Sequence, residues 1–375
     1  MATRRRRRKN TNGLLKALIG ILALVLVLVV AVAACMKEDP QMPPATDPTD
    51  STQTTPSTTV PPTTVPIRTG WQELPEGKYY YDETGEPVTG LQTIEGKQWL
   101  FAESGVLCGP GWQEVYDEKY YLNEDLTLYT GWLEQDDVKY YLQADGTMAK
   151  GQVEIDGETW FFTSTGAQIY VVNPWHSVPE GYKVTLKSLP SEYATSKKVA
   201  DFIYDDLMEM IKDCEDAMRE AFAGTGKTIP TVWVRSANRT NTDQRILFEN
   251  KVARVKAANP GLSQEEAEIE AAKVVAPPGT SEHQLGLAVD LVDKRLNSLV
   301  EEQENMEAQI WLMENCWKYG FILRYPKGTT DITGIIYEPW HYRYVGHELA
   351  EEIHELGITL EEYINNLTET PADAQ

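Results

Sequence analysis

The stretch Ser281-Glu282-His283-Gln284-Leu285-Gly286-Leu287-Ala288-Val289-Asp290 decides how this chain is interpreted, together with Glu338-Pro339-Trp340-His341 further along. Two imidazoles and one carboxylate, from His283, His341 and Asp290, can form a facial set of ligands for a divalent metal. A further carboxylate, Glu338, precedes the last imidazole and can act on metal-bound water. Each of these residues taken alone also has a structural interpretation. The pattern as a whole indicates the chemistry of metal-assisted hydrolysis.

The local sequence agrees with this chemistry. A three-ligand zinc site with an open position lowers the pKa of bound water to about 7, which supplies a nucleophile at neutral pH. Glu338 would accept the water proton and pass it to a leaving amine. Because Pro339 keeps the residue before it out of helical geometry, we expect an extended, turned segment from which Glu338 and His341 reach one cavity. Leu287, Val289 and Leu291 alternate as in a core strand, and Gly286 suggests a close backbone approach.

Both segments resemble the signatures of VanY-type D-alanyl-D-alanine carboxypeptidases, a zinc peptidase family that also holds LD-carboxypeptidases. The family pattern S-x-H-x-x-G-x-A-x-D is complete, and so is E-x-W-H. The resemblance extends to residues 311–315, 319–326 and 332–334, and it spans residues 180–368. It implies an α+β zinc peptidase domain with a small antiparallel sheet.

The resemblance also implies roles for individual residues. His283, Asp290 and His341 match the ligands of one Zn²⁺ ion, and Glu338 matches the catalytic base. Arg239 falls where the family uses an Arg to hold the oxyanion or the substrate carboxylate. The remaining matches are substrate-side positions, which are Ser281, Gln244 and Trp340. The family's Gly-Tyr pair before this Arg is here Ala237-Asn238, so the loop can differ in shape, and Arg235 is a competing candidate that lies out of register.

The implied activity is removal of the C-terminal D-Ala from peptidoglycan stem pentapeptides. An LD-carboxypeptidase that acts on stem tetrapeptides is the alternative, and the sequence does not decide between them. A non-catalytic cell-wall-binding protein is a third hypothesis. A vestigial site would be expected to lose at least one of His283, Asp290, Glu338 and His341, and all four are present.

The N-terminus predicts a membrane attachment. Arg4 to Arg8, Lys9 and Lys16 precede an uncharged apolar run over residues 17–34, which is long enough for a membrane span. Positive charge before the run favours a cytoplasmic N-terminus and an extracellular remainder. Residues 32–35 also resemble a lipoprotein processing box, in which Cys35 would be lipidated. Either anchor predicts a wall-associated enzyme on the outer face of a Gram-positive cell membrane.

The charge of the chain excludes one class of partner. The 34 basic and 57 acidic residues give a net charge of −23. Residues 1–35 hold seven basic and no acidic residues, so the remainder carries 27 basic against 57 acidic residues, a net charge of −30. Since nucleic-acid binding needs a basic surface, we expect no nucleic-acid partner.

A linker and a repeat array follow the anchor. Residues 36–68 are rich in Thr, Pro, Ser and Asp and predict an extended linker. In residues 69–172, Gly recurs at intervals of 20, 21, 20 and 20, with paired aromatics between, which predicts stacked β-hairpins. These glycines begin the pairs Gly70-Trp71, Gly90-Leu91, Gly111-Trp112, Gly131-Trp132 and Gly151-Gln152.

The array resembles the choline-binding-type cell-wall repeats of Gram-positive surface proteins. That resemblance implies teichoic acid or another wall polymer as a partner, bound by aromatic cages through cation–π contacts. Leu91 and Gln152 replace the Trp after Gly, and Lys119 and Lys139 stand where an aromatic is often found. Only some cages can therefore be complete, and a passive spacer with an aromatic core is the alternative.

Residues 173–368 are expected to form the carboxypeptidase domain, with a polar tail at 369–375. This division implies that residues 1–174 can be removed without loss of hydrolysis of a soluble peptide. Apolar spacing predicts helices over 196–222, 243–257, 263–274, 303–319 and 348–366. Strands are expected at Val232 and Val234, at 288–292, at Ile322 and at Tyr337. Cys214 and Cys316 are expected to be buried thiols or a disulfide, and His347 and His354 to be surface residues.

Overall fold

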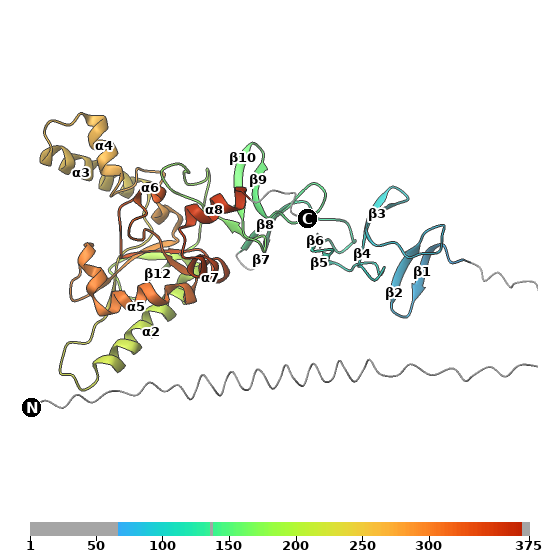
Figure 1. Cartoon of the computed structure of the whole chain (residues 1–375), viewed down its shortest axis with the longest axis horizontal. Coiled ribbons are helices and arrows are strands. Elements are labelled where there is room, and N and C mark those ends of the chain that lie inside the picture. The colour runs from blue at the N-terminus through green and yellow to red at the C-terminus, as the bar shows by residue number, and fades with distance from the viewer. Residues whose placement is uncertain (1–66, 136–137, 370–375) are drawn as a thin grey trace, which may run out of the picture. The chain divides into compact units, whose positions relative to one another are not determined.

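The computed structural model describes residues 67–135 and 138–369 (Figure 1). The first part of this region is the expected array of two-stranded antiparallel hairpins. The first four hairpins are β1 (Gly70–Leu74) with β2 (Gly77–Tyr81), β3 (Gly90–Ile94) with β4 (Lys97–Phe101), β5 (Gly111–Val115) with β6 (Glu118–Leu122), and β7 (Gly131–Gln135) with β8 (Val138–Leu142). In the last repeat, β9 (Gly151–Ile155) and β10 (Glu158–Phe162) are joined by β11 (Gln168–Ile169) to make three strands.

Aromatic side chains connect successive hairpins. Trp112 contacts Tyr121 of its own hairpin, with ring centroids 5.3 Å apart, and Tyr140 of the next hairpin at 5.0 Å. Both pairs are edge-to-face, which is a favoured arrangement of aromatic rings. A single hairpin is at best marginally stable, so these inter-repeat contacts explain why the motif occurs as an array.

A four-stranded antiparallel sheet organises the second half of the chain. Its order is β14 (Val232–Ser236), β15 (Ala288–Asp293), β17 (His341–Tyr344) and β16 (Phe321–Leu323). A separate small ribbon pairs β12 (Leu186–Ser188) with β13 (Lys198–Ala200). The expected small antiparallel sheet is therefore present, but the strand expected at Tyr337 is wrong. The turn at Pro339 delays the strand until His341.

Helices pack around this sheet. The regular helices are α2 (Tyr204–Phe222), α3 (Asn241–Ala258), α4 (Gln264–Ala272), α5 (Glu307–Asn315), α6 (Thr330–Thr333), α7 (His347–Leu356) and α8 (Leu360–Glu369). Four 3₁₀ turns accompany them, η1 (Asp201–Ile203), η2 (Glu282–Leu285), η3 (Glu301–Asn305) and η4 (Cys316–Tyr319). Figure 1 shows α2 and α5 side by side, and their apolar residues share one core cluster with β14 and β15.

Three of the expected helices differ in their bounds. Residues 198–200 at the start of the expected 196–222 helix form strand β13 instead. The helix expected over 303–319 is divided into η3, α5 and η4. The helix expected over 348–366 is broken at Gly357, which adopts the left-handed conformation with φ of 65°. Such a glycine is a common helix terminator.

Cys214 and Cys316 are free, buried thiols, which excludes the disulfide alternative. Burial raises the pKa of each thiol to about 12. His347 and His354 are exposed, as expected. No helix of the described region is long and apolar enough to cross a membrane. The expected anchor at residues 17–34 and most of the linker lie outside that region.

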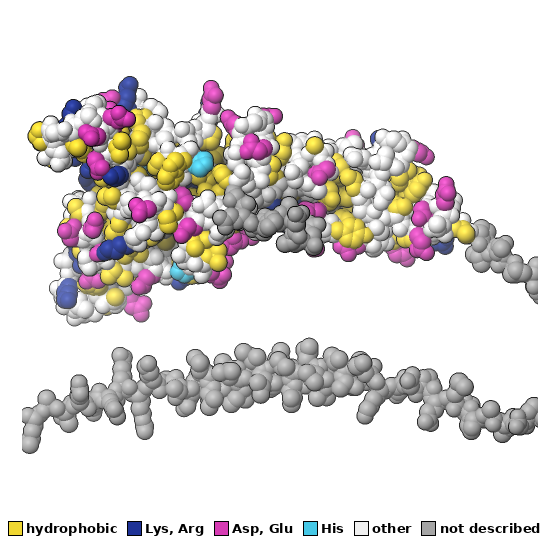
Figure 2. Space-filling view, turned by 45° about the horizontal axis from the view of Figure 1, so that its top comes forward, with side chains coloured by type: hydrophobic (Ala, Val, Ile, Leu, Met, Phe, Trp, Pro, Cys, Tyr) yellow, Lys and Arg dark blue, Asp and Glu magenta, His cyan; other side chains and the backbone are white. Residues whose placement is uncertain are grey.

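Acidic side chains are spread over the face of the molecule shown in Figure 2. The Lys and Arg side chains on this face are scattered among them. This distribution agrees with the negative net charge of the chain.

The end of the repeat array contributes to the core of the second half. Val172 is fully buried in the same cluster as Val234 and Leu291. Phe161 and Ile169 belong to a second cluster, with apolar residues of α7 and α8. At the surface, Thr165 donates a hydrogen bond to Glu348 at the start of α7, with an oxygen–oxygen distance of 2.7 Å. The last repeat therefore packs as part of this domain.

These contacts predict that the choice of truncation point will matter. Removing residues 1–174 deletes Val172 and the whole last repeat, whereas removing residues 1–129 keeps them. Because burying one large apolar side chain contributes about 1.5–3 kcal/mol, we expect the shorter chain to lose at least about 3 kcal/mol of unfolding free energy relative to the longer one. Urea denaturation of both chains measures this difference. Equal unfolding free energies would show that the last repeat is an independent unit.

Candidate metal centre

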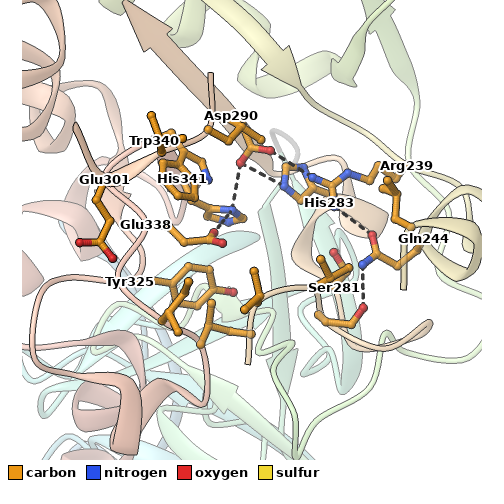
Figure 3. Close-up of a pocket in the computed structure, with 18 of the residues that line it drawn as sticks. Arg239, Gln244, Ser281, His283, Asp290, Glu301, Tyr325, Glu338, Trp340 and His341 are labelled. Carbon is orange, nitrogen blue, oxygen red and sulfur yellow. Dashed lines mark hydrogen bonds and ion pairs between the residues drawn. The ribbon is translucent and has the colours of Figure 1, made fainter. Parts of the chain in front are cut away.

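Three side chains, two of them from the central strands of the sheet, converge in one place (Figure 3). His283 lies on η2, Asp290 on β15 and His341 at the first position of β17. Asp290 Oδ1 lies 3.3 Å from His283 Nε2 and 3.2 Å from His341 Nδ1. Ligand atoms of the three residues all lie within 4.8 Å of one another. The three ligands predicted from the sequence are thus brought together.

The backbone explains why they meet. Asp290 and His341 are directly opposed in the antiparallel register of β15 and β17, and opposed residues of such a pair place their side chains close together. Gly286, with φ of 76°, ends η2 and turns the chain into β15. A Cβ at this position would lie 3.3 Å from the Ala200 backbone nitrogen. The close approach expected at Gly286 is therefore real.

The donor set fits a divalent metal ion. Asp290 Oδ1 is buried and has no hydrogen-bond partner within the described residues, although a buried polar atom normally has one. His283 Nδ1 lies 2.9 Å from the carbonyl oxygen of Ala237. Donation of the Nδ1 proton to that carbonyl leaves the Nε2 lone pair facing the other two ligands. Two imidazole nitrogens and one carboxylate oxygen are ligands that suit zinc.

The electrostatics of the cluster favour a positive charge between the ligands. Burial and the charge of Arg239 lower the pKa of His283 to about 4, so this imidazole is neutral at physiological pH. Burial by itself lowers the pKa of His341, but hydrogen bonding to Asp290 and Glu282 outweighs it and raises this pKa to about 9. Of these two carboxylates, Asp290 faces Nδ1 of the imidazole and Glu282 faces Nε2. A cation at Nδ1 would be stabilised by Asp290 as a proton is.

Glu338 lies beside this cluster and adds a second carboxyl group to that of Asp290. The turn at Pro339 brings Glu338 Oε2 to 3.6 Å from His341 Nδ1, as the sequence predicted. Burial raises the pKa of Glu338 to about 8. Figure 3 shows its carboxylate pointing toward His341 within the cavity. A carboxyl group with a raised pKa, next to three ligands, has the properties of a proton carrier.

Arg239 reaches the cluster from the loop after β14. Its Nη2 donates to Asp290 Oδ2 at 3.0 Å, on the carboxylate oxygen that faces away from the imidazoles. Nε donates to Ser236 at 2.8 Å, and Nη1 donates to Gln244 at 3.0 Å. A guanidinium carries five N–H donors, so two remain for a bound molecule. The competing candidate, Arg235, is exposed and does not line the cavity.

The three expected substrate-side residues all line the cavity. Gln244 is fully buried, and its amide nitrogen donates to the carbonyl oxygen of Ala276 at 2.7 Å. Since its oxygen accepts from Arg239, both polar ends of Gln244 are engaged within the protein. Ser281 and Trp340 are also buried. We infer that Gln244 acts by holding Arg239, while Ser281 and Trp340 form the wall.

The cavity has a volume of about 580 Å³, which suits a small peptide or other small ligand. Sequence reasoning missed several of its residues. Tyr325 packs against the His341 ring with centroids 4.8 Å apart, and Glu301 lies across the cavity from Arg239 (Figure 3). Glu282, behind the metal ligands, was also missed. The position of Glu282 next to His283 was the one indication of a role in the sequence. The residues that Glu282 contacts are distant in sequence, so the contacts themselves could not be predicted.

Comparison with known proteins shows what the region of this site is similar to. Residues 207–347, which include Arg239 and the ligand cluster, match the family model of VanY, D-alanyl-D-alanine carboxypeptidase. Residues 111–125 and 130–148 match a model of cell wall binding repeats of the choline-binding type. A D-alanyl-D-alanine carboxypeptidase of Enterococcus faecalis is 38% identical over 197 residues, covering 52% of this chain and 65% of that protein. This chain therefore spans just under two thirds of the relative's length.

Two solved structures are similar to the same half of the chain. VanYB in complex with D-Alanine-D-Alanine is 39% identical, with a TM-score of 0.43, and covers 52% of this chain and 96% of that one. The LdcB LD-carboxypeptidase is 31% identical, with a TM-score of 0.43, and covers 52% and 84%. Residues 207–347, which carry the ligand cluster, are thus a domain that matches the VanY D-alanyl-D-alanine carboxypeptidase model, and this domain follows cell wall binding repeats of the choline-binding type.

Proposed function

We propose that this protein is a zinc-dependent D-alanyl-D-alanine carboxypeptidase that removes the C-terminal D-Ala from peptidoglycan stem pentapeptides. The observation that carries the proposal is the buried cluster of His283, Asp290 and His341, with Glu338 on one side and Arg239 on the other. These residues provide metal ligands, a proton carrier and a fixed cation within one cavity. The E. faecalis relative that shares this half of the chain carries the same activity in its name.

Each residue then has a defined task in peptide hydrolysis. A zinc ion in such a site supplies a water of lowered pKa and polarises the scissile carbonyl. Glu338 takes the water proton on its carboxylate and delivers it to the leaving amine of D-Ala. Arg239 keeps Asp290 in place through one nitrogen. Arg239 also lines the cavity, where its two remaining N–H groups can stabilise the oxyanion or bind the terminal carboxylate.

Arg239 also supports the proposal that the substrate is cleaved at its C-terminal end. A carboxypeptidase must recognise a free terminal carboxylate, and a planar guanidinium binds a carboxylate through two parallel hydrogen bonds. Ser236, Gln244 and Asp290 fix the guanidinium from three directions, so its orientation is set before a substrate arrives. A guanidinium that is already oriented favours binding of the substrate carboxylate in one orientation.

We also propose that the protein is held on the outer face of a Gram-positive cell membrane, by residues 17–34 or by a lipid on Cys35. The motivation is the basic, then apolar, N-terminal sequence. Export agrees with a substrate in the cell wall. Mass spectrometry of the membrane-extracted protein separates the two anchors, because a lipoprotein would begin at a modified Cys35.

The repeats are proposed to bind a wall polymer through one of their aromatic clusters. In the first cluster the protein's own cations cover the rings, since Lys78 Nζ lies 4.5 Å from the centroid of Trp71 and Lys97 Nζ lies 5.3 Å from that of Trp99. The cluster of Trp132, Tyr141 and Trp160 has ring centroids 5.2 and 4.8 Å from Trp132. Trp132 is partly exposed, so this cluster can receive an external cation.

The reaction is tested with purified muropeptides and the Glu338→Gln variant. We expect the wild-type protein to convert pentapeptides to tetrapeptides, as measured by mass spectrometry. The variant should keep its zinc and lose about 10² to 10⁴ in kcat, because it cannot carry a proton. Conversion of tetrapeptides to tripeptides instead would assign LD-carboxypeptidase activity. Loss of zinc in the variant would make Glu338 a ligand, and unchanged turnover would remove it from the mechanism.

The role of Arg239 is tested by Arg239→Lys, which keeps the charge and removes the planar fork. We expect a loss of at least about tenfold in kcat/KM, with little change for the matched Arg235→Lys variant on the exposed face. Amidating the C-terminus of the substrate should cost the wild-type protein more than the Arg239→Lys variant. Equal penalties would show that Arg239 serves the oxyanion only.

Wall binding is tested with Trp132→Ala in the full chain. We expect weaker sedimentation with isolated cell walls and unchanged hydrolysis of a soluble stem peptide, because Trp132 lies in the array. Trp71→Ala is the matched control, since Lys78 already covers that ring, and its effect should be smaller. Competition by free choline would identify choline as the ligand. Full wall binding by the Trp132→Ala variant would show that this aromatic cluster does not bind the wall polymer.

A further inference from the structure

We propose that Glu282 is a positioning residue for the metal ligand His341, and that the segment after the last repeat completes the buried charge network that holds Glu282. This inference rests on the proposed metal site but concerns a residue that does not line the cavity. Glu282 is 1% exposed and lies on η2, directly before the ligand His283. Its role therefore has to be exerted through its neighbours.

The two carboxylate oxygens of Glu282 have different surroundings. Oε1 accepts hydrogen bonds from Arg324 Nε at 2.7 Å and from Arg343 Nη1 at 2.8 Å. Oε2 has no hydrogen-bond partner within the described residues and lies 3.5 Å from His341 Nε2. His341 Nε2 likewise has no other partner there. Glu282 Oε2 and His341 Nε2 are therefore placed to pair with each other.

This pairing fixes which nitrogen of His341 faces the metal. Nδ1 faces Asp290 and Glu338, so in a neutral imidazole that binds metal through Nδ1 the proton resides on Nε2. Nε2–H can then donate to Glu282 Oε2. A carboxylate behind a metal-binding histidine orients the ring and raises its basicity. His283 is held differently, by the carbonyl oxygen of Ala237, so the two imidazoles are supported by acceptors of different charge.

Two buried arginines keep Glu282 ionised and in place. Burial alone raises the pKa of Glu282, but the charges of Arg324 and Arg343 outweigh it and hold this pKa below its usual range. Arg324 also forms a two-pronged pair with Glu361 of α8, with distances of 2.7 and 2.5 Å. The network holds two guanidinium groups and two carboxylates. Buried charges are tolerated only when they are fully paired in this way.

The chain that leaves the repeat array closes the network. Arg343 Nη2 donates to the carbonyl oxygen of Tyr170 at 2.7 Å. Asn173 Nδ2 donates to Glu361 Oε1 at 3.0 Å. Residues 170–173 follow β11 directly, so a continuous series of contacts runs from the last repeat through Arg343 and Glu282 to His341. The segment that leaves the last repeat is in this way connected to the residues that lie behind the metal site.

Glu282→Gln and Glu361→Gln in the full chain test the proposal. Each variant removes one carboxylate from the same network, but only Glu282 faces His341. We measure the zinc dissociation constant by competition with a chelator, together with Tm of the zinc-free protein. We expect Glu282→Gln to weaken zinc binding about 10- to 100-fold, and Glu361→Gln to lower Tm while it keeps zinc affinity within about twofold of the wild type.

A third variant covers the case in which Glu282→Gln does not fold. Glu282→Asp keeps the charge that pairs with both arginines but withdraws the carboxylate from His341, so it should also weaken zinc binding. Wild-type zinc affinity in a folded Glu282 variant would overturn the proposal, as would an equal loss in Glu361→Gln. If the wild-type protein bound zinc but did not cleave stem peptides, the proposed function would fail while the role of Glu282 would stand.

Discussion

The structure depends on one buried carboxylate. Asp290 lies on the central strand β15, 2% exposed, between two imidazoles on one side and Arg239 on the other. An ionised group at such a depth is costly unless opposite charges and hydrogen bonds surround it. The fold meets this requirement by register, since β15 and β17 oppose Asp290 and His341 directly. The geometry that makes the core stable is therefore also the geometry that can hold a metal.

Residues that carry chemistry were predictable because their signal is local. Residues 281–290 and 338–341 indicated a possible metal site before any contact was known, and the resemblance of both segments to VanY signatures implied the three ligands and the role of Glu338. Helix α3 was predicted to within two residues of its bounds, and its start is fixed locally by the capping box of Thr240 and Asp243. The strand expected at Tyr337 was wrong, since alternation alone does not show where the turn at Pro339 ends. The division of the 303–319 helix into three pieces likewise follows from packing.

The support of the site was not predictable, because it is built from distant residues. Glu282, Arg324, Arg343 and Glu361 come from four separate segments of the chain, and nothing in their spacing indicates that they meet. The burial of Val172 and the contacts of Tyr170 and Asn173 also depend on tertiary packing. The expected boundary between residues 172 and 173 separates the repeats from the domain that the last repeat helps to complete. Repeats with this role can tie wall attachment to the integrity of the metal site.

His283, Asp290 and His341 are proposed to hold one zinc ion, with His341 bound through Nδ1. Anomalous diffraction at the zinc absorption edge, from crystals of the full chain grown with zinc, locates the ion. We expect one strong peak about 2.0–2.2 Å from His283 Nε2, an Asp290 oxygen and His341 Nδ1. A peak bonded to His341 Nε2, or strong peaks only at other residues, would contradict it.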